Sequence, residues 1–459
     1  MFLFLTVRHI PLGPGDRERE RAKKESFKVA LVIMSSSPPE SPTMDSEYLK
    51  HGQSKPSFLQ VSGTVSQWSS LPKDLLITIE EEYLDLYTDK IRFRCVCSSW
   101  RSRLSKMPNH KNSRLPWLLI PHNHEITCGF MEPLEKRVHK LELPESGEKV
   151  FKGSAYGWVV IAEKSSSIYL VNPLTKARIK LPPRSKFPDV RKYHANKHGK
   201  EYLLWSLSLI SVPGEYYSVD STGVRNDLLQ KVVLSSSPTC SNFVAVAIYG
   251  ELGSLAYYKR GDKKWSVLHD RAPPYKDAIF HDGQLYALKG NGQLMVCDIG
   301  SYPKPIVTEV APEPSRTPFG DLHLVESSSG IMMVQQCFKR GYIYEPSELY
   351  IRKTTSFNIF RLDTNCRNWY QVQSLGDDVL FLGLNSSISI SSHDYPDTYK
   401  GNCIYFTDVN YNFDLEGTGR GFDEGIFCLD ENKIEPLPAY VGDSHEVWPA
   451  PIWVTPNPY

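Results

Sequence analysis

Residues that could carry out catalysis or bind a metal are scattered through this sequence in small groups. His122 and His124 could place two imidazoles on one face of a strand, as a metal site requires, but no distant ligand pair completes the set. His–Asp pairs at 269–270, 281–282 and 393–394 have the composition of a base and its orienting carboxylate. Each pair stands where a strand gives way to a turn, which explains its polarity without catalysis. The sequence therefore predicts no catalytic residue, no metal and no cofactor.

The nine cysteines form no recognisable ligand or disulfide pattern. None belongs to a CxxC pair, and the cysteines of a small secreted disulfide domain would be more closely spaced. They stand at positions 95, 97, 128, 240, 297, 337, 366, 403 and 428. We therefore expect reduced thiols in a reducing compartment.

The composition of the 459-residue chain is that of an ordinary globular protein long enough for two or three domains. Because 53 Lys and Arg balance 52 Asp and Glu, no net field attracts nucleic acid or an anionic membrane, and we exclude both as main partners. The initial run MFLFL is too short for a signal-peptide core, and no segment approaches the roughly 20 apolar residues of a membrane span. We expect the protein in the cytoplasm, the nucleus or both.

Residues 1–67 are expected to form a disordered tail, and residues 105–114 a polar connector. The tail contains SSSPPESPT, a Ser/Pro-rich stretch that cannot build a core. Met34 and Met44 are candidate alternative starts, and a start at Met34 would make the first 33 residues dispensable.

Residues 68–104 are expected to form three short helices. Pro72 suits the first turn of the first helix, where its missing N–H has no cost. The second helix begins after Thr88 and Asp89, and the third begins at Ser98 or Ser99.

The apolar positions of these helices are too numerous for so small a domain. Leu75, Leu76 and Ile79 form a stripe on the first helix, and Trp100 and Leu104 share a face of the third. A domain of under about 40 residues buries little surface, so part of this apolar surface needs a partner. The segment is therefore predicted to be an interaction module.

From residue 115 to the end, the pattern changes to period-two strands with Gly, Asn and Asp at the turns. An apolar strand ending in Asp or Asn, a polar turn and a second strand recur at 168–182, 254–268, 293–307, 357–372 and 425–438. A further strand precedes these units at 157–162, 243–249, 283–289, 330–336 and 402–408. Repeats of a few strands at this spacing are typical of the blades of a β-propeller.

We predict a propeller of six blades over residues 115–459, with seven as the alternative count. The blades are expected near 115–144, 150–182, 231–268, 276–309, 320–373 and 377–438. The strand Ile452–Thr455 is left without a blade and is predicted to pair with the strand at 116–120, which removes two exposed edges. Trp158, Trp265 and Trp369 are predicted to pack between blades.

With both halves in view, the chain resembles plant F-box proteins whose C-terminal half is a kelch-like, KIB-type β-propeller. The F-box likeness lies in SSLPKDLLITI (69–79) and DKIRFRCVCSSWRS (89–102). The propeller likeness lies in PWLLI, GWVVIA with LVNPLTKARIKLP, FNIFRLD…NWYQVQSLGDDVLFLG and WPAPIWVTPN. The acidic EEEYLDLYTDK between the first two helices is a departure that could adjust the choice of adaptor.

This resemblance implies a non-catalytic substrate receptor of an SCF-type E3 ubiquitin ligase. The F-box would dock on a Skp-type adaptor, which joins a cullin and a RING subunit, and the propeller would hold a target protein for ubiquitination and degradation. Four positions match the docking motif: Leu71, Pro72, Leu75 and Leu76. Ile79, Val96 and Trp100 are added to this adaptor-binding set, and Trp100 is expected to anchor the contact.

Two loops are candidates for target binding because they are unusually long for a compact domain. The first, 183–230, begins with a basic stretch, and the second, 409–424, is acidic. We expect the basic loop to contribute to recognition through Arg184, Lys186, Arg191 and Lys192. Two alternatives to the ligase stay open: a propeller-fold hydrolase, and an F-box scaffold that acts outside the ligase.

Overall fold

The computed structural model describes residues 69–84, 90, 93–94, 96–104, 115–121, 127–132, 137–142, 149–205, 215–269, 274–301, 304–314, 320–343, 349–396, 398–407, 423–437 and 451–457. The chain divides into two compact units, residues 1–113 and 114–459. The expected tail and connector lie outside the described residues, so their character stays a prediction.

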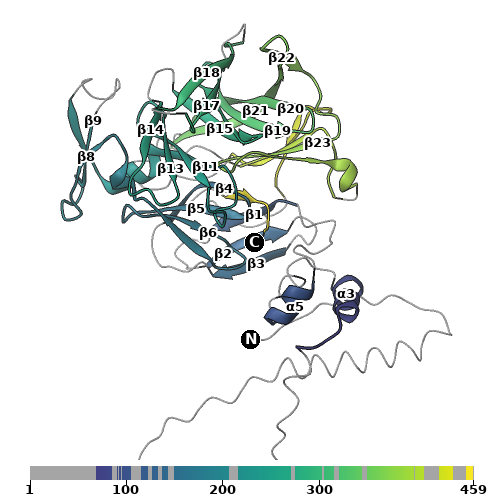
Figure 1. The fold of residues 1–459 in the computed structure, drawn as a ribbon. Helices are drawn as coiled ribbons and strands as arrows, with labels where there is room; N and C mark the ends of the chain where they lie inside the picture. The colour runs from purple at the N-terminus through teal and green to yellow at the C-terminus, as the bar shows by residue number, and fades with distance from the viewer. Residues whose placement is uncertain are drawn as a thin grey trace, which may run out of the picture. The chain divides into compact units, whose positions relative to one another are not determined.

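The first unit is helical where it is described, and we call it the helical unit. It contains α3 (Lys73–Glu82) and α5 (Ser98–Arg103) (Figure 1). Pro72 is the N-cap residue of α3 and Asp74 lies in its first turn, close to the expected start of this helix. The third predicted helix is confirmed by α5, whereas most of the second falls outside the described residues.

The second unit, which we call the propeller unit, consists almost entirely of β-sheet. Its first sheet joins the two ends of the unit in the order β28-β1-β2-β3. These strands are β1 (Trp117–Pro121), β2 (Thr127–Glu132), β3 (Arg137–Glu142) and β28 (Ile452–Val454). Trp453 pairs with Leu118 in antiparallel register, which confirms the predicted closure by the C-terminal strand.

Three further sheets are antiparallel meanders of four strands each. The second sheet contains β4 (Lys149–Ala155), β5 (Trp158–Glu163), β6 (Ile168–Val171) and β7 (Arg178–Leu181). The third contains β11 (Leu229–Leu234), β12 (Val244–Tyr249), β13 (Ser254–Lys259) and β14 (Ser266–His269). The fourth contains β15 (Tyr275–His281), β16 (Gln284–Lys289), β17 (Leu294–Asp298) and β18 (Ile306–Ala311).

The fifth and sixth sheets complete the series. The fifth is a meander of β19 (Asp321–Ser327), β20 (Gly330–Ile343), β21 (Leu349–Asp363) and β22 (Asn368–Val372). The sixth has the order β24-β23-β25-β26-β27, and β23 and β25 pair in parallel. Its elements are β23 (Asp378–Leu382), β24 (Ile388–Ser391), η4 (Ser392–Asp394), β25 (Cys403–Phe406), β26 (Gly425–Cys428) and β27 (Lys433–Glu435). The five predicted strand–turn–strand units are all confirmed as hairpins within these sheets.

These six sheets contact one another in a closed cycle. Apolar clusters join the second sheet to the third, the third to the fourth, and so on to the sixth and first. The first and second sheets meet where Ser154 Oγ donates to the carbonyl oxygen of Trp453, and Asn172 Nδ2 donates to that of Asn457 at 2.6 Å. At Gly153 on β4, a Cβ atom would lie 2.1 Å from the carbonyl oxygen of Val232, so only glycine permits this approach of β4 to β11.

Two predicted tryptophans join neighbouring sheets. The Trp265 indole donates to the carbonyl oxygen of Pro182, and the Trp369 indole donates to that of Gly292, each at 2.9 Å. Trp158 is buried in the cluster between the second and third sheets. The prediction that these rings pack between repeats is confirmed.

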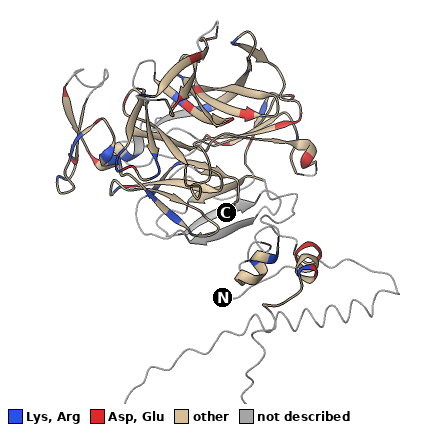
Figure 2. Ribbon diagram, in the orientation of Figure 1, with Lys and Arg blue, Asp and Glu red and all other residues tan. Residues whose placement is uncertain are grey.

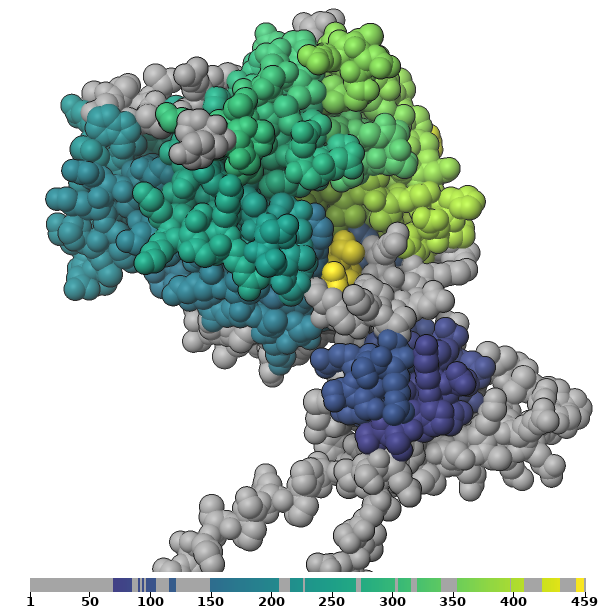
Figure 3. All heavy atoms as spheres, viewed as in Figure 1, coloured from purple at the N-terminus to yellow at the C-terminus, as the bar shows by residue number. Residues whose placement is uncertain are grey.

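The segment 183–230, expected to be a long loop, contains a seventh sheet, which we call the outer sheet. Its strands are β8 (Val190–Tyr193), β9 (Tyr202–Trp205) and β10 (Tyr216–Val219), flanked by η2 (Arg184–Lys186), α6 (Ser221–Gly223) and η3 (Val224–Leu228). It lies at the left edge of the propeller unit in Figure 1 and forms a separate lobe in Figure 3. The expectation of a loop was wrong because strands of four residues carry little periodic signal.

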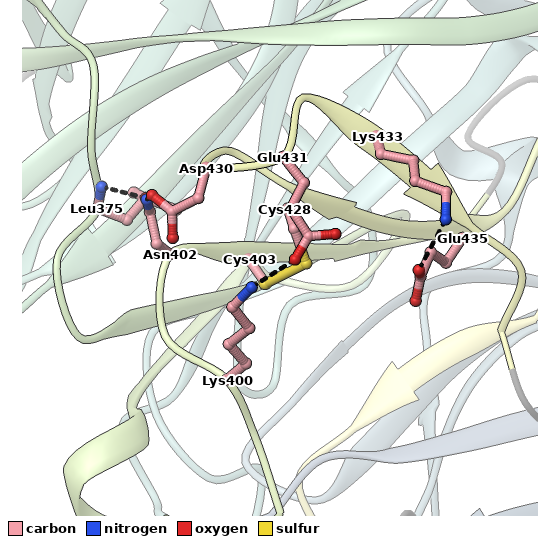
Figure 4. The surroundings of a disulfide bond; sticks show 9 residues. All are labelled: Leu375, Lys400, Asn402, Cys403, Cys428, Asp430, Glu431, Lys433 and Glu435. Atoms are coloured by element: carbon pink, nitrogen blue, oxygen red, sulfur yellow. Dashed lines mark hydrogen bonds and ion pairs between the residues drawn. A yellow bond between two sulfur atoms is a disulfide. The ribbon is translucent and has the colours of Figure 1, made fainter.

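One pair of cysteines departs from the expectation of reduced thiols. Cys403 and Cys428 stand directly opposite each other on β25 and β26, with their Cα atoms 4.3 Å apart, and form a disulfide (Figure 4). Beside it, the Asn402 side chain donates to Asp430 at 2.6 Å and accepts from the Leu375 amide at 2.8 Å. The register of the two strands, which the spacing of cysteines in the sequence does not reveal, brings the sulfurs together.

Candidate functional site

The helix α3 divides its apolar residues between an interior and an exposed face. Leu76 is fully buried, while Leu75, its neighbour in the chain, is 50% exposed. Adjacent residues of a helix point about 100° apart, so one face of α3 can pack inward only if the other stays outside. Leu71 and Ile79 are half-buried at the border of these faces, and Pro72 is exposed.

The helix α5 supplies the other wall of this interior. The Cys97 sulfur caps it by accepting from the Trp100 amide, and the Trp100 ring lies 4.7 Å from the Phe93 ring, centroid to centroid. Trp100 and Leu104 are both buried in the same cluster as Leu76, which confirms that they share a face. The small core is therefore built around Trp100.

Polar contacts fix α3 and the residues before it to Arg94 and to α5. Arg94 Nη2 donates to the Glu80 carboxylate at 2.6 Å, and both side chains are about 5% exposed or less. Arg103 Nη1 donates to the carbonyl oxygen of Leu71 at 2.6 Å, and Ser99 Oγ donates to that of Ser69 at the same distance. These bonds hold the start of α3 against α5, so the exposed face is a defined surface.

The seven predicted adaptor-binding residues thus fall into two groups. Trp100, expected to be the anchor, is 1% exposed and Leu76 is fully buried, so both stabilise the unit from inside. Leu75 at 50% and Val96 at 43% are the large apolar residues exposed on the described part of the unit. Together with Pro72 these two are the exposed members of the predicted set, and contact with an adaptor stays a prediction.

The predicted target-binding cations differ in whether they are buried or exposed. Arg184 is buried, and its guanidinium forms two bonds of 2.7 and 2.8 Å to the Asp189 carboxylate while lying over the Phe187 ring. This residue holds the start of the outer sheet and is buried, whereas the contribution of the basic segment to target recognition stays a prediction. Arg191 and Lys192 on β8 are exposed, as is Lys186. Nearly all of the acidic loop 409–424 lies outside the described residues.

The outer sheet has a buried face and an exposed face, which follow from its register. Tyr202 and Leu204 on β9 are buried against Val224, and burial raises the pKa of Tyr202 to about 12, so this phenol stays neutral. On the opposite face, Trp205 and Tyr216 pair across β9 and β10 and are 40% and 48% exposed. We did not predict this aromatic pair, although the alternation in YLLW and EYYSV carried its signal.

The described members of the His–Asp pairs do not converge on a catalytic centre, and Asp270 lies outside the described residues. His269 Nδ1 lies 2.9 Å from the Tyr275 hydroxyl and His281 Nδ1 lies 2.9 Å from Glu326, while His393 is exposed in η4. Among the described residues, no group of three or more His, Cys, Asp or Glu side chains could hold a metal, and His122 and His124 lie outside them. Nor does any described helix have the length and apolarity needed to cross a membrane.

A buried polar network crosses the inner strands of three sheets. The Asp277 carboxylate accepts from Lys231 Nζ at 2.6 Å, from the Ala278 amide at 2.7 Å and from the Leu324 amide at 2.8 Å. His323, fully buried beside it, lies 3.1 Å from Gln336 Oε1, and burial lowers its pKa. Because these groups bond to one another and to backbone amides across sheets, the network joins the sheets.

Comparisons with known proteins agree with this architecture. A family model described as "KIB1-4 beta-propeller" matches residues 130–428. F-box protein SKIP23 of Arabidopsis thaliana is 28% identical over 418 residues, which cover 84% of this chain and 95% of that protein. A second F-box protein of that plant is 27% identical over 415 residues, with the same two coverages. Among solved structures, TolB from Acinetobacter baumannii aligns over 61% of this chain and 68% of its own at 15% identity, with a TM-score of 0.23.

Proposed function

The chain belongs to the KIB1-4 beta-propeller family and is a plant F-box protein with a propeller domain, and on this basis we propose that it is the substrate receptor of an SCF-type E3 ubiquitin ligase. The helical unit is the F-box that docks on a Skp-type adaptor, and a cullin and a RING subunit join through that adaptor. The propeller holds the target protein. The chain itself supplies proximity and no reaction, which replaces a bimolecular encounter by a local one.

The observation that carries the adaptor proposal is the exposed apolar face of the helical unit. Leu75 and Val96 are exposed although the unit has a core, because a core of this size cannot enclose them. Exposed apolar side chains on a rigid small unit are typical of an interface. Pro72, at the start of α3, is exposed as well, while Leu71 is half-buried against the core.

We further infer that the six sheets of the closed cycle are six propeller blades, and that the outer sheet is an insertion between the second and third blades. The outer sheet follows β7 and precedes β11 in the chain and has an apolar cluster of its own around Tyr202, Leu204 and Val224. It is joined to the cycle through Val190 of β8, which packs against the cluster between the second and third sheets. The closure of the first blade by β28 agrees with this count. A cytoplasmic or nuclear location is part of the same proposal.

The adaptor proposal is tested by co-purification of the full chain with a Skp-type adaptor. The double variant Leu75→Ala/Val96→Ala should weaken adaptor binding by at least about tenfold, because interface apolar residues contribute over about 1 kcal/mol each where they matter. The matched control is Ile306→Ala, since Ile306 is an aliphatic residue of the propeller unit that is 57% exposed. The control should bind as the wild type does.

A second variant separates docking from folding. Leu76→Ala removes a buried side chain and should destabilise the helical unit by about 2–5 kcal/mol, so its adaptor binding should fall together with its helical circular dichroism signal. Wild-type affinity in Leu75→Ala/Val96→Ala would contradict the proposed docking face. A target whose half-life does not change when the protein is removed would contradict the ligase role.

A further inference from the structure

The exposed face of the outer sheet presents two aromatic side chains side by side. Trp205 on β9 and Tyr216 on β10 are directly opposite in the register, with ring centroids 4.9 Å apart at an interplanar angle of 68°. Of the large apolar residues exposed in the described part of the propeller unit, these two form a pair in contact. Trp and Tyr are the residues most enriched at the energetic centres of protein interfaces.

The pair stands on a rigid support. The opposite face of the sheet is buried on Tyr202, Leu204 and Val224, and the Trp205 amide donates to the carbonyl oxygen of Asp189 at 3.0 Å. Asp189 is itself held by the two bonds from Arg184. Rings that are already positioned lose little conformational entropy when a partner binds.

The charges around this face are unbalanced. Three carboxylates of the segment are engaged within it: Asp189 binds Arg184, Glu201 accepts from the Gly199 and Ser221 amides, and Asp220 accepts from the Gly223 amide. The exposed cations Arg191, Lys192, Lys197 and Lys200 have no carboxylate partner among the described residues, and Figure 2 shows Lys and Arg on β8. Glu215 is the exposed acid beside Tyr216. A partner that neutralises the surplus must be acidic.

We propose that the exposed face of the outer sheet docks an acidic peptide segment of the target protein, with a large apolar or aromatic side chain of that segment on Trp205 and Tyr216 and its carboxylates toward Arg191 and Lys192. This inference rests on the proposed function, in which the propeller unit holds the target. A short acidic segment suits this surface better than a nucleic acid, because a net charge of +1 gives the whole chain no field for a polyanion.

The test uses the full chain and a phage-displayed library of random dodecapeptides as the probe. Selection on the wild type, with counter-selection on Trp205→Ser/Tyr216→Ser, should enrich acidic sequences that contain an apolar or aromatic residue. One enriched peptide, labelled with a fluorophore, is then measured by fluorescence anisotropy. Its affinity should fall at least about tenfold in Trp205→Ser/Tyr216→Ser and in Arg191→Glu/Lys192→Glu, and the wild-type affinity should fall with added salt.

Matched controls decide the outcome. Tyr370→Ser removes a ring of the fifth sheet that is 49% exposed and should leave the affinity unchanged. Three results would overturn the inference. They are selected peptides without acidic bias, a wild-type affinity in either of the two surface variants, and a 20-mer of deoxythymidine that binds the wild type more tightly than the peptide does. The adaptor co-purification keeps the two proposals apart: adaptor binding without peptide binding removes this inference alone, whereas a wild type that binds no adaptor removes the proposed function.

Discussion

Leu75 and Leu76 of the helical unit are adjacent in the chain, yet one is half exposed and the other fully buried, whereas Leu380 and Phe381 of the propeller unit are adjacent and both fully buried. The strand β23 sends Leu380 toward the fifth sheet and Phe381 toward the first, because neighbouring residues of a strand point to opposite faces and each face has a neighbouring sheet. The helical unit has one interior and therefore one buried face. In the closed cycle of sheets, each sheet is covered on both faces by its neighbours. The helical unit is too small to cover both faces of α3, so apolar side chains stay exposed there.

The same contrast holds for the outer sheet within the propeller unit. One face of this sheet is packed, and the other carries Trp205 and Tyr216, over which no sheet formed by the described residues lies. Surfaces available for partners therefore occur where an element lies outside the cycle of sheets. Substitutions of buried residues should therefore lower the stability of the propeller unit. Substitutions on the two partner surfaces should change partner binding and leave that stability unchanged.

The largest expected effect is the loss of a buried charge in the propeller unit. Asp277→Ala leaves Lys231, 5% exposed, without its carboxylate and breaks bonds between three sheets. We expect the free energy of unfolding of this unit to fall by about 3–5 kcal/mol, because breaking a buried pair leaves an uncompensated charge. Denaturant titration followed by tryptophan fluorescence measures it.

The control for this variant is an ion pair of the same length on the surface. Glu431→Ala breaks the exposed 2.6 Å pair with Lys400 and should not change the unfolding midpoint measurably. Adaptor binding at a temperature where the propeller is folded should survive in both variants. Equal midpoints for Asp277→Ala and Glu431→Ala would show that the buried network does not join the sheets.

A smaller effect is expected from the disulfide of the sixth sheet. Reduction opens a cross-link between residues 25 positions apart, which should lower the free energy of unfolding by about 3 kcal/mol in the loop-closure model. Denaturant titration with and without dithiothreitol measures the change. The variant Cys403→Ala/Cys428→Ala should lose the response to dithiothreitol.

Reduction should affect the propeller unit and leave the helical unit unchanged. Cys97, in the helical unit, is a free thiol, so adaptor binding should not respond to dithiothreitol. A midpoint that does not move in the wild type would contradict a stabilising disulfide. A loss of adaptor binding on reduction would contradict the independence of the units.

The sequence predicted features that depend on local pattern or on chain ends. The unit at 168–182 was expected to contain a polar turn after a strand ending in Asp or Asn, and the Asn172 side chain accepts there from the Leu174 and Thr175 amides at 3.0 Å. The pairing of β28 with β1 could be predicted because a ring with one unpaired strand at its end requires closure.

Features that depend on register or on the direction of a side chain could not be predicted in the same way. Hydrophobic spacing placed both Leu75 and Leu76 in one stripe, but only the packed structure tells which of them faces Trp100. A basic segment grouped Arg184 with Lys186, Arg191 and Lys192, and its pattern does not reveal that Arg184 pairs with Asp189, five residues away across a turn. The Cys403–Cys428 pair likewise depends on which residues of β25 and β26 are opposite.

The smallest expected effect is a dependence of propeller stability on pH. Burial lowers the pKa of His323 below its ordinary value of about 6.5. The charge of Lys231 lowers this pKa further, while the charges of Asp277 and Asp321 raise it without cancelling the effect of burial. As the pH falls below about 6.5, the unfolded chain binds a proton that the folded chain does not, so stability decreases, by at most about 1.4 kcal/mol per pH unit. Urea titrations at pH 7.5 and 5.5 measure the difference.

The contribution of His323 is isolated by comparing variants. His323→Gln keeps an N–H donor toward Gln336 but cannot titrate, so its stability should fall less between pH 7.5 and 5.5 than that of the wild type. His393→Gln, at an exposed position of η4, should keep the wild-type difference. If the two variants respond alike, the pH dependence arises elsewhere in the chain, and the buried network then holds His323 without an energetic penalty for its charge.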